Sequence, residues 1–123
     1  MIDYMRVTKE PLKKDWISLA AQVDDSIFKD ALKRCVEVVG ENLDTFTYKF
    51  PSAGGADGVY QPTNNADEFL YSDWTSSFWT GMVWLAYELT KDEKFSRTGL
   101  IHSESFRQRY ETNDILDHHD IGF

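Results

Sequence analysis

The stretch SDWTSSFWTGMVWLAYE, residues 72–88, decides how this chain folds. Ser72 or Asp73 can cap a helix, because a short polar side chain at that position accepts a hydrogen bond from a free amide of the first turn. From about Trp74 to Leu89, apolar residues then occupy most of the helix circumference: Phe78, Trp79, Met82, Val83, Leu85 and Ala86. A helix without a polar face is typical of a buried position, so we expect an inner helix that is covered on all sides.

One amphipathic helix is expected before this apolar helix in the sequence, and another after it. The first begins at Asp24 or Asp25, repeats apolar residues at three- and four-residue spacing as far as Phe46, and ends at Pro51. The other follows a tight turn and is capped by Asp92, and its polar composition predicts a more exposed helix.

Residues 52–71 are rich in glycine and asparagine and show no strand pattern, so they are predicted to form an irregular loop. Loops of that length in a compact domain are more often functional than idle. The chain is therefore predicted to be all-α, with residues 1–24 as a lead-in and residues 25–123 as a set of helical hairpins. Three or four helices do not complete a layered assembly in which outer helices cover inner ones, so an incomplete part of a larger helical fold is expected.

The composition excludes several classes of protein. A net charge of −8, from 13 basic and 21 acidic residues, argues against a nucleic-acid surface. Neither a signal peptide nor a membrane-spanning run is recognisable, so a soluble, cytoplasmic protein is expected. The single cysteine, Cys35, rules out an internal disulfide, and its apolar neighbours predict a small core residue.

Residues 117–120 read Asp-His-His-Asp, with apolar residues on both sides. Titratable groups clustered against apolar surroundings are typical of sites where pKa values are tuned for chemistry. By contrast, His102 has polar neighbours on the third predicted helix and is expected to be solvated. Arg107 and Arg109 could meet a sugar carboxylate, but arginines on an exposed helix are usually solvated.

Two segments resemble motifs of the unsaturated glucuronyl hydrolases, glycoside hydrolase family 88. Residues 72–88 look like the family signature Asp-Trp-Thr-Asp-Gly-Phe-Trp-x-Gly-x-x-Trp-Leu-x-Tyr-Glu, and residues 91–95 are similar to the turn and helix start that follow it. Residues 116–123, LDHHDIGF, look like Leu-Asp-His-His-Asp-x-Gly-Phe. Two long motifs in the right order are more specific than either alone. The resemblance covers roughly residues 26–123 and corresponds to the N-terminal portion of a family member.

The resemblance implies a six-hairpin (α/α) barrel with its active site at one end of the inner ring of helices. It implies a glycoside hydrolase of carbohydrate metabolism and glycosaminoglycan degradation. The substrate is an oligosaccharide left by a polysaccharide lyase, with a 4,5-unsaturated uronic acid at its non-reducing end. An acid protonates C4 of this sugar, positive charge develops at C5 and the ring oxygen, water adds at C5, and the hemiketal opens to release the aglycone. No cofactor is expected.

Three residues take roles from the resemblance. Asp120 matches the essential aspartate of its motif, the catalytic carboxylate that holds the substrate beside the acid. His119 matches a substrate-contacting histidine, and Trp74 matches a tryptophan suited to stacking on the sugar. The acid/base aspartate of the family lies beyond residue 123, so the chain alone is expected to be inactive. Ser76 and Ser77 replace the usual Asp-Gly, which is expected to loosen the packing around Trp74.

Three other interpretations remain open. The chain could be a non-enzymatic helical fragment of a split or truncated gene, which associates with itself or with a missing C-terminal part. It could belong to the unsaturated rhamnogalacturonyl hydrolases, which share the barrel and the chemistry. Manganese phosphoesterases also carry Asp-His-His, but they place it after a β-strand, whereas here a helix is predicted before it, so no metal is expected.

Overall fold

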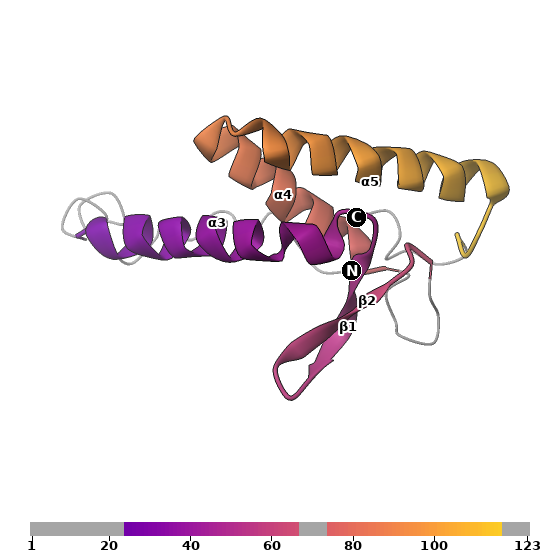
Figure 1. Ribbon diagram of the computed structural model, residues 1–123, viewed down its shortest axis with the longest axis horizontal. Coiled ribbons are helices and arrows are strands. Elements are labelled where there is room, and N and C mark those ends of the chain that lie inside the picture. Colours follow the sequence, from indigo (N-terminus) through magenta and orange to yellow (C-terminus); the bar gives the residue numbers. More distant parts are fainter. Residues whose placement is uncertain (1–23, 67–73, 117–123) are drawn as a thin grey trace, which may run out of the picture. The chain divides into compact units, whose positions relative to one another are not determined.

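The computed structural model describes residues 24–66 and 74–116, and these form three helices and two strands (Figure 1). The elements are α3 (Ser26–Phe46), β1 (Phe50–Ala56), β2 (Val59–Thr63), α4 (Ser76–Thr90) and α5 (Glu93–Thr112). The chain divides into two compact units, Met1–Leu32 and Lys33–Phe123. Residues 1–23 of the predicted lead-in lie outside the described residues, and its boundary at residue 24 stays a prediction.

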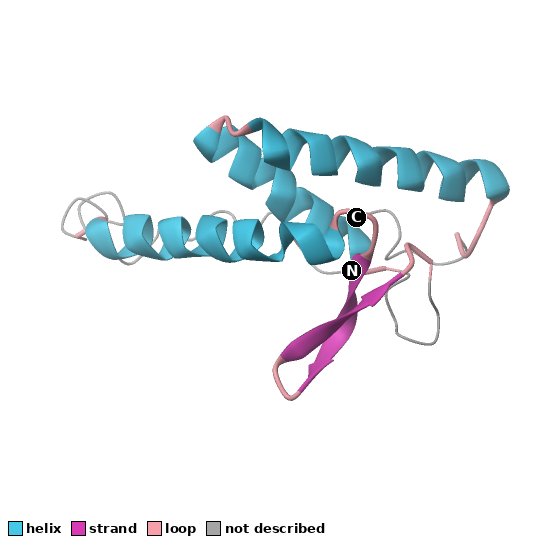
Figure 2. Cartoon of the chain, viewed as in Figure 1, coloured by secondary structure: helices cyan, strands magenta, loops and turns pink. Residues whose placement is uncertain are grey.

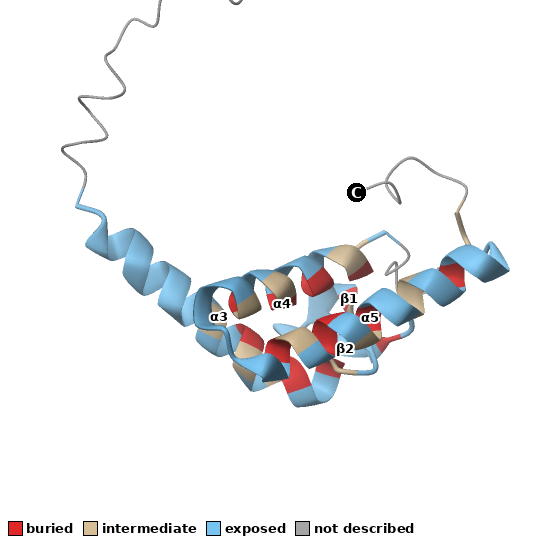
Figure 3. Cartoon of the chain, turned by 90° about the horizontal axis from the view of Figure 1, so that it is seen from above, coloured by how far each residue is buried: buried red, intermediate tan, exposed pale blue. Residues whose placement is uncertain are grey.

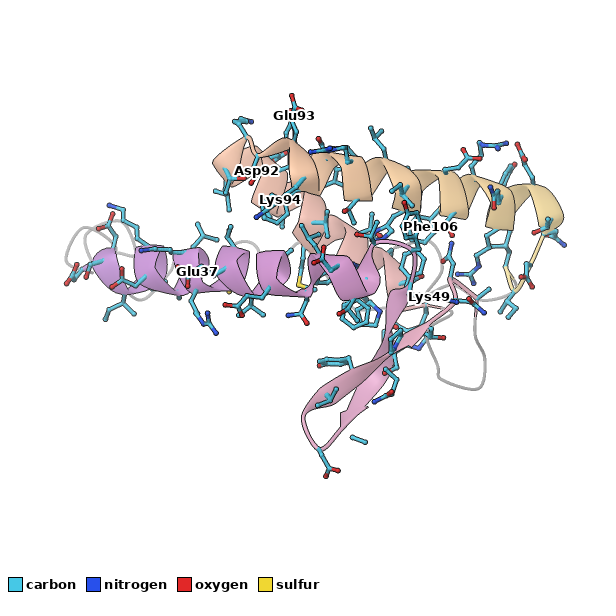
Figure 4. All side chains as sticks on the ribbon, viewed as in Figure 1. Glu37, Lys49, Asp92, Glu93, Lys94 and Phe106 are labelled. Atoms are coloured by element: carbon cyan, nitrogen blue, oxygen red, sulfur yellow. The ribbon has the colours of Figure 1, made fainter. Side chains whose placement is uncertain are left out.

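The caps expected from the sequence are found for α3 and α5, whereas the cap predicted for α4 at Ser72 or Asp73 is wrong, because α4 begins at Ser76 with Thr75 as its N-cap. Asp24 Oδ1 accepts a hydrogen bond from the amide of Ser26 at 2.9 Å, which confirms the predicted start of α3. Asp92 Oδ1 accepts one from the amide of Lys94 at 3.0 Å and so caps α5; both residues are labelled in Figure 4. The predicted end of α3 at Pro51 is wrong, because α3 ends at Phe46 and Pro51 lies within β1.

The all-α prediction is wrong for residues 50–63, where β1 and β2 pair as an antiparallel hairpin (Figure 2). Asp57 and Gly58 form its two-residue turn, and both have positive φ, 54° and 76°. This is the geometry of a type I′ turn, for which Asp-Gly is a strong sequence signal. The strands themselves contain proline, glycine, serine and alanine in place of alternating apolar residues, so the sequence shows no strand periodicity here.

The second unit has one apolar core to which α3, β1, α4 and α5 all contribute, and Figure 3 marks the buried residues in red. The rings of Phe46 and Trp79 meet edge-on with centroids 5.4 Å apart. Trp79 is therefore a core residue as predicted, whereas Trp84 is only half-buried. Cys35 is exposed, which corrects its predicted place in the core. The full set of buried apolar residues is Val39, Leu43, Phe46, Phe50, Trp79, Val83, Ala86 and Phe95.

One side of α4 remains exposed within the part of the chain that the structure describes. We call it the apolar face of α4, and it consists of Phe78, Met82, Leu85 and Leu89. Spacings of four, three and four residues place these side chains on one side of the helix. Their exposed fractions lie between 46% and 58%, so the all-round burial predicted for this helix is not reached here. Among the described residues, no helix combines the length and apolarity needed to span a membrane.

The close approach of α4 and α5 depends on Gly99. A Cβ at this position would lie 2.5 Å from Cε2 of Trp84, whereas a Cβ at Gly81 would meet nothing within 4 Å. We predict that Gly99→Ala lowers the free energy of unfolding by about 1–3 kcal/mol, because the clash with the indole outweighs the better helix propensity of alanine. The matched change Gly81→Ala should raise it by about 0.5–1 kcal/mol. Urea unfolding of both variants measures these changes. Similar effects of the two substitutions would show that the packing of α4 on α5 does not require glycine at position 99.

Candidate functional site

The start of α4 and the end of α5 lie at the same end of this helix pair, because a two-residue turn joins the helices in antiparallel fashion (Figure 1). Lys91, in this turn, has a left-handed backbone, and its amide donates to the carbonyl of Tyr87 at 2.7 Å. The tight turn expected at this position is thereby confirmed. The segment that follows α5 leads on in sequence to the Asp-His-His-Asp motif, and Trp74 lies just before α4.

Trp74 is the predicted site residue that falls within the described part of the chain. Its side chain is 39% exposed, and its ring meets Phe78 edge-on with centroids 6.3 Å apart. The ring is therefore partly exposed among the described residues, and its predicted role in stacking on a sugar stays a prediction. His119 and Asp120 lie outside the described residues, as do Asp117 and His118.

Asn65 joins the loop after β2 to both helices. Its side-chain oxygen accepts a hydrogen bond from the Ser76 hydroxyl at 2.9 Å, and its amide nitrogen donates to the hydroxyl of Ser105 at 3.1 Å. Asn65 and Ser76 are 8% and 1% exposed. Ser76 therefore ties the loop to the start of α4, while the predicted loosening of the packing around Trp74 stays a prediction.

Arg109 is buried, contrary to the solvated side chain expected on α5. Its guanidinium donates to three backbone carbonyls, those of Asn65 at 3.1 Å, Asp114 at 3.0 Å and Ile115 at 2.6 Å. The arginine thus connects the loop after β2 with the segment that leaves α5. These three bonds give Arg109 a structural role, because they hold together two segments that lie far apart along the chain.

Arg107 is exposed, as the sequence predicts, and pairs with Glu104 and Glu111 on the surface of α5. The hydrogen bond from Arg107 lowers the pKa of Glu104 to about 2. Ion pairs of this kind between exposed side chains contribute little to stability. Two arginines only two positions apart on one helix therefore have opposite surroundings.

His102 is fully buried, so its predicted solvation is also wrong. Its Nε2 lies 2.8 Å from the carbonyl oxygen of Phe46, which can only accept, so Nε2 carries the proton. Nδ1 lies 3.1 Å from the hydroxyl of Thr80, and the ring centroid lies 4.6 Å from that of Phe50. Burial lowers the pKa of His102, although hydrogen bonds to the backbone of Phe46 and Thr47 oppose the shift. The neutral imidazole thus joins α3, α4 and α5.

The structural roles of Asn65, His102 and Arg109 were missed in the sequence because each residue bonds to a partner far away along the chain. Their burial follows from the packing of α4 on α5 and from the hairpin, and neither is visible in local periodicity. Asn65 lies two residues after β2, so recognising the Asp57-Gly58 turn would have placed it at the end of a strand. Among the described residues, no three His, Cys, Asp or Glu side chains are grouped so as to hold a metal ion.

Comparison with known proteins identifies relatives of this chain, although no family model matches it. An unsaturated glucuronyl hydrolase of Bacillus sp. strain GL1 is 34% identical over 97 residues, which is 79% of this chain and 24% of that relative. An unsaturated chondroitin disaccharide hydrolase of Streptococcus pneumoniae is 36% identical over 93 residues, 76% of this chain and 22% of the relative. This chain is a relative of the unsaturated glucuronyl hydrolases.

Solved structures of unsaturated glucuronyl hydrolases agree with the described fold. The crystal structure of the Streptococcus agalactiae enzyme matches with a TM-score of 0.73 at 30% identity, over 82% of this chain and 24% of that one. The enzyme of Bacillus sp. GL1 matches with a TM-score of 0.65 at 35% identity. The chain thus spans about a quarter of the length of the unsaturated glucuronyl hydrolases that it matches. It shares their mainly helical fold over that quarter, with the β1–β2 hairpin as the exception to an all-α class.

The buried neutral state of His102 predicts a stability that depends on pH. In the unfolded chain this histidine has its ordinary pKa of 6.5, and burial lowers the pKa in the folded chain, so acid protonates the unfolded form first. The stability from neutral His102 should be present above about pH 6.5 and should decline as the pH falls from there towards the folded-state pKa. Urea unfolding between pH 7.5 and 5.5 measures this decline.

The control is the variant His102→Gln, which cannot take up a proton at this position and should lose less stability over the same pH interval. If the variant does not fold, the imidazole proton signals of wild-type His102 serve the same purpose and should titrate with a midpoint below pH 6.5. A parallel decline of both proteins, or a wild-type ring that titrates at or above pH 6.5, would show that the account is wrong.

Proposed function

We propose that this chain supplies part of the active site of an unsaturated glucuronyl hydrolase. The reaction is hydrolysis of the 4,5-unsaturated uronic acid at the non-reducing end of oligosaccharides produced by polysaccharide lyases. The observation that carries the proposal is the position of Trp74: it is partly exposed and lies two residues before the start of α4, the helix that packs against α5, and α5 leads on in sequence to the Asp-His-His-Asp motif. The names of the relatives, which include unsaturated chondroitin disaccharide hydrolases, support a uronyl disaccharide as substrate.

The chemistry needs one acid, one supporting carboxylate and a fixed sugar ring. Protonation of C4 moves the π electrons of the C4=C5 bond into the new C–H bond and leaves positive charge on C5 and the ring oxygen. Water then adds at C5 and loses a proton, and opening of the hemiketal releases the aglycone. In this scheme Asp120 is the carboxylate beside the acid, where it holds the substrate and stabilises positive charge. His119 contacts the sugar, and Trp74 stacks on one face of it.

The finer architecture that we propose is the N-terminal part of a six-hairpin (α/α) barrel. The apolar face of α4 supports this proposal, because four large side chains about half exposed on one helix are typical of a surface that another element covers. In such a barrel, further helices would cover this face, and one of them would carry the acid/base aspartate beyond residue 123. The cytoplasmic location expected from the sequence stays a prediction.

A second candidate function is a non-enzymatic helical polypeptide that associates through the apolar face of α4. The exposure of Phe78, Met82, Leu85 and Leu89 is the observation that favours it. Its partner would be a second copy of this chain or a polypeptide carrying the remaining helices. An unsaturated rhamnogalacturonyl hydrolase would use the same residues, but the names of the relatives favour the glucuronyl substrate.

A chimera tests the proposed roles most sharply. In it, this chain replaces the matching quarter of the Bacillus sp. GL1 unsaturated glucuronyl hydrolase, which supplies the remaining three quarters. We predict that the chimera removes the ultraviolet absorbance of an unsaturated chondroitin disaccharide. Asp120→Asn should lower the rate by about 10²–10⁴-fold, the usual contribution of a carboxyl group in acid–base catalysis. A folded, active chimera that keeps full activity with Asp120→Asn would contradict the role assigned to Asp120.

The 123-residue chain alone is the control, and it should leave the absorbance unchanged because it lacks the acid. Light scattering and circular dichroism on the same sample establish whether the inactive chain is folded and whether it associates. A robust loss of absorbance with the isolated chain would show that the acid lies within these residues. A monodisperse monomer that unfolds cooperatively would argue against the second candidate function.

A further inference from the structure

The turn after α5 has an unusual backbone. Asn113 closes the helix in a left-handed conformation, and the amides of Asn113 and Asp114 donate to the carbonyls of Tyr110 and Arg109 at 3.2 and 3.1 Å. This is a Schellman cap, in which asparagine is well tolerated. Two residues later, Ile115 also has a positive φ of 47°. A β-branched residue in this region is a genuine outlier, which persists only where its surroundings fix it.

Arg109 supplies the contacts that fix this backbone. Its Nη2 donates to the carbonyl of Ile115 at 2.6 Å and its Nε to that of Asp114 at 3.0 Å. Its Nη1 donates to the carbonyl of Asn65 at 3.1 Å. Arginine suits this task because its planar group holds several donors in one rigid arrangement and always remains charged. With a side chain that is mostly buried, Arg109 clamps the turn against the loop after β2.

The same clamp is connected to the start of α4, close to Trp74 in sequence, through one further side-chain hydrogen bond. Asn65 accepts from Ser76 at 2.9 Å, and Ser76 lies two residues after Trp74 in the sequence. On the other side, His119 and Asp120 follow Ile115 by four and five residues. A change of φ at Ile115 alone would redirect the chain that follows it, because φ and ψ are the soft rotations of the backbone.

We infer that Arg109 is a positioning residue for the proposed active site. It holds Ile115 in the left-handed conformation and ties this turn to Asn65. It thereby fixes the backbone at Asp114 and Ile115, from which the chain continues in sequence to His119 and Asp120. This inference rests on the proposed function for the roles of Trp74, His119 and Asp120. The clamp itself rests on the described contacts alone.

The primary test compares Arg109→Gln with Arg107→Gln in the isotopically labelled 123-residue chain. The coupling constant between the amide and α protons of Ile115, together with its carbon chemical shifts, reports its φ. In Arg109→Gln we expect these values to move towards an ordinary extended or helical backbone, and we expect the amide of Asp114 to exchange at least about tenfold faster. Arg107→Gln removes only surface ion pairs on the same helix and should leave both readouts unchanged. An unchanged Ile115 in folded Arg109→Gln would overturn the inference.

A rescue experiment keeps the test decisive if Arg109→Gln folds poorly. Glycine adopts a positive φ without steric penalty, so Ile115→Gly should relieve the strain that Arg109 holds in place. In the Ile115→Gly background, Arg109→Gln should accelerate the exchange of the Asp114 amide at least about threefold less than in the wild-type background. Equal acceleration in both backgrounds, or loss of folding in both, would show that Arg109 does not act through Ile115.

The functional consequence is measured in the chimera with the Bacillus enzyme. Arg109→Gln should lower kcat/KM for the unsaturated disaccharide at least about tenfold, mainly through kcat, because a displaced carboxylate supports the transition state less well. Arg107→Gln should remain within about twofold of the parent. Full activity of Arg109→Gln alongside a released turn would overturn the positioning role. An inactive parent chimera would instead count against the proposed function. The contact between Arg109 and the turn at Ile115 is tested independently, by the measurements on the 123-residue chain.

Discussion

Asn65 is the residue through which three separate parts of the second unit are joined. Its side chain bonds to Ser76 at the start of α4 and to Ser105 on α5, and its carbonyl accepts from Arg109. Burial makes these bonds matter, because removing one partner leaves other polar groups without water or a substitute. The loop after the hairpin, the start of α4 and the segment after α5 therefore share one polar cluster. These are the segments that adjoin Trp74 and the Asp-His-His-Asp motif in the sequence.

The apolar core and this polar cluster have complementary roles. The core brings α3, β1, α4 and α5 together, but hydrophobic contact is non-directional and sets no particular hydrogen-bonding geometry. His102 links the two regions, because it lies among core aromatic rings and bonds to Phe46 and Thr80. The ring of Phe106, labelled in Figure 4, packs on Phe50 with centroids 5.6 Å apart and extends the core towards the hairpin. Directional polar contacts then fix the ends of the helices that the core has assembled.

Local patterns in the sequence predicted those elements whose physics is local. Helix periodicity and the caps at Asp24 and Asp92 are properties of a few neighbouring residues, and both caps are confirmed. The buried state of Arg109 follows instead from contacts with Asn65, 44 residues away, and no local pattern distinguishes it from exposed Arg107. His102 was misjudged for the same reason, since its partner Phe46 lies 56 residues away. Of the residues predicted for the site, Trp74 is described just before α4, and the roles of Trp74, His119 and Asp120 all stay predictions.

Asn65 stabilises the second unit through its buried hydrogen bonds, and its exposed neighbour Asn64 provides the comparison. Asn64 is exposed and accepts a hydrogen bond from Lys49, labelled in Figure 4, at 2.7 Å. The most direct measurement is urea unfolding of Asn65→Ala beside Asn64→Ala. The account predicts a loss of about 1–3 kcal/mol for Asn65→Ala and less than about 0.5 kcal/mol for Asn64→Ala. Equal losses for the two variants would contradict it.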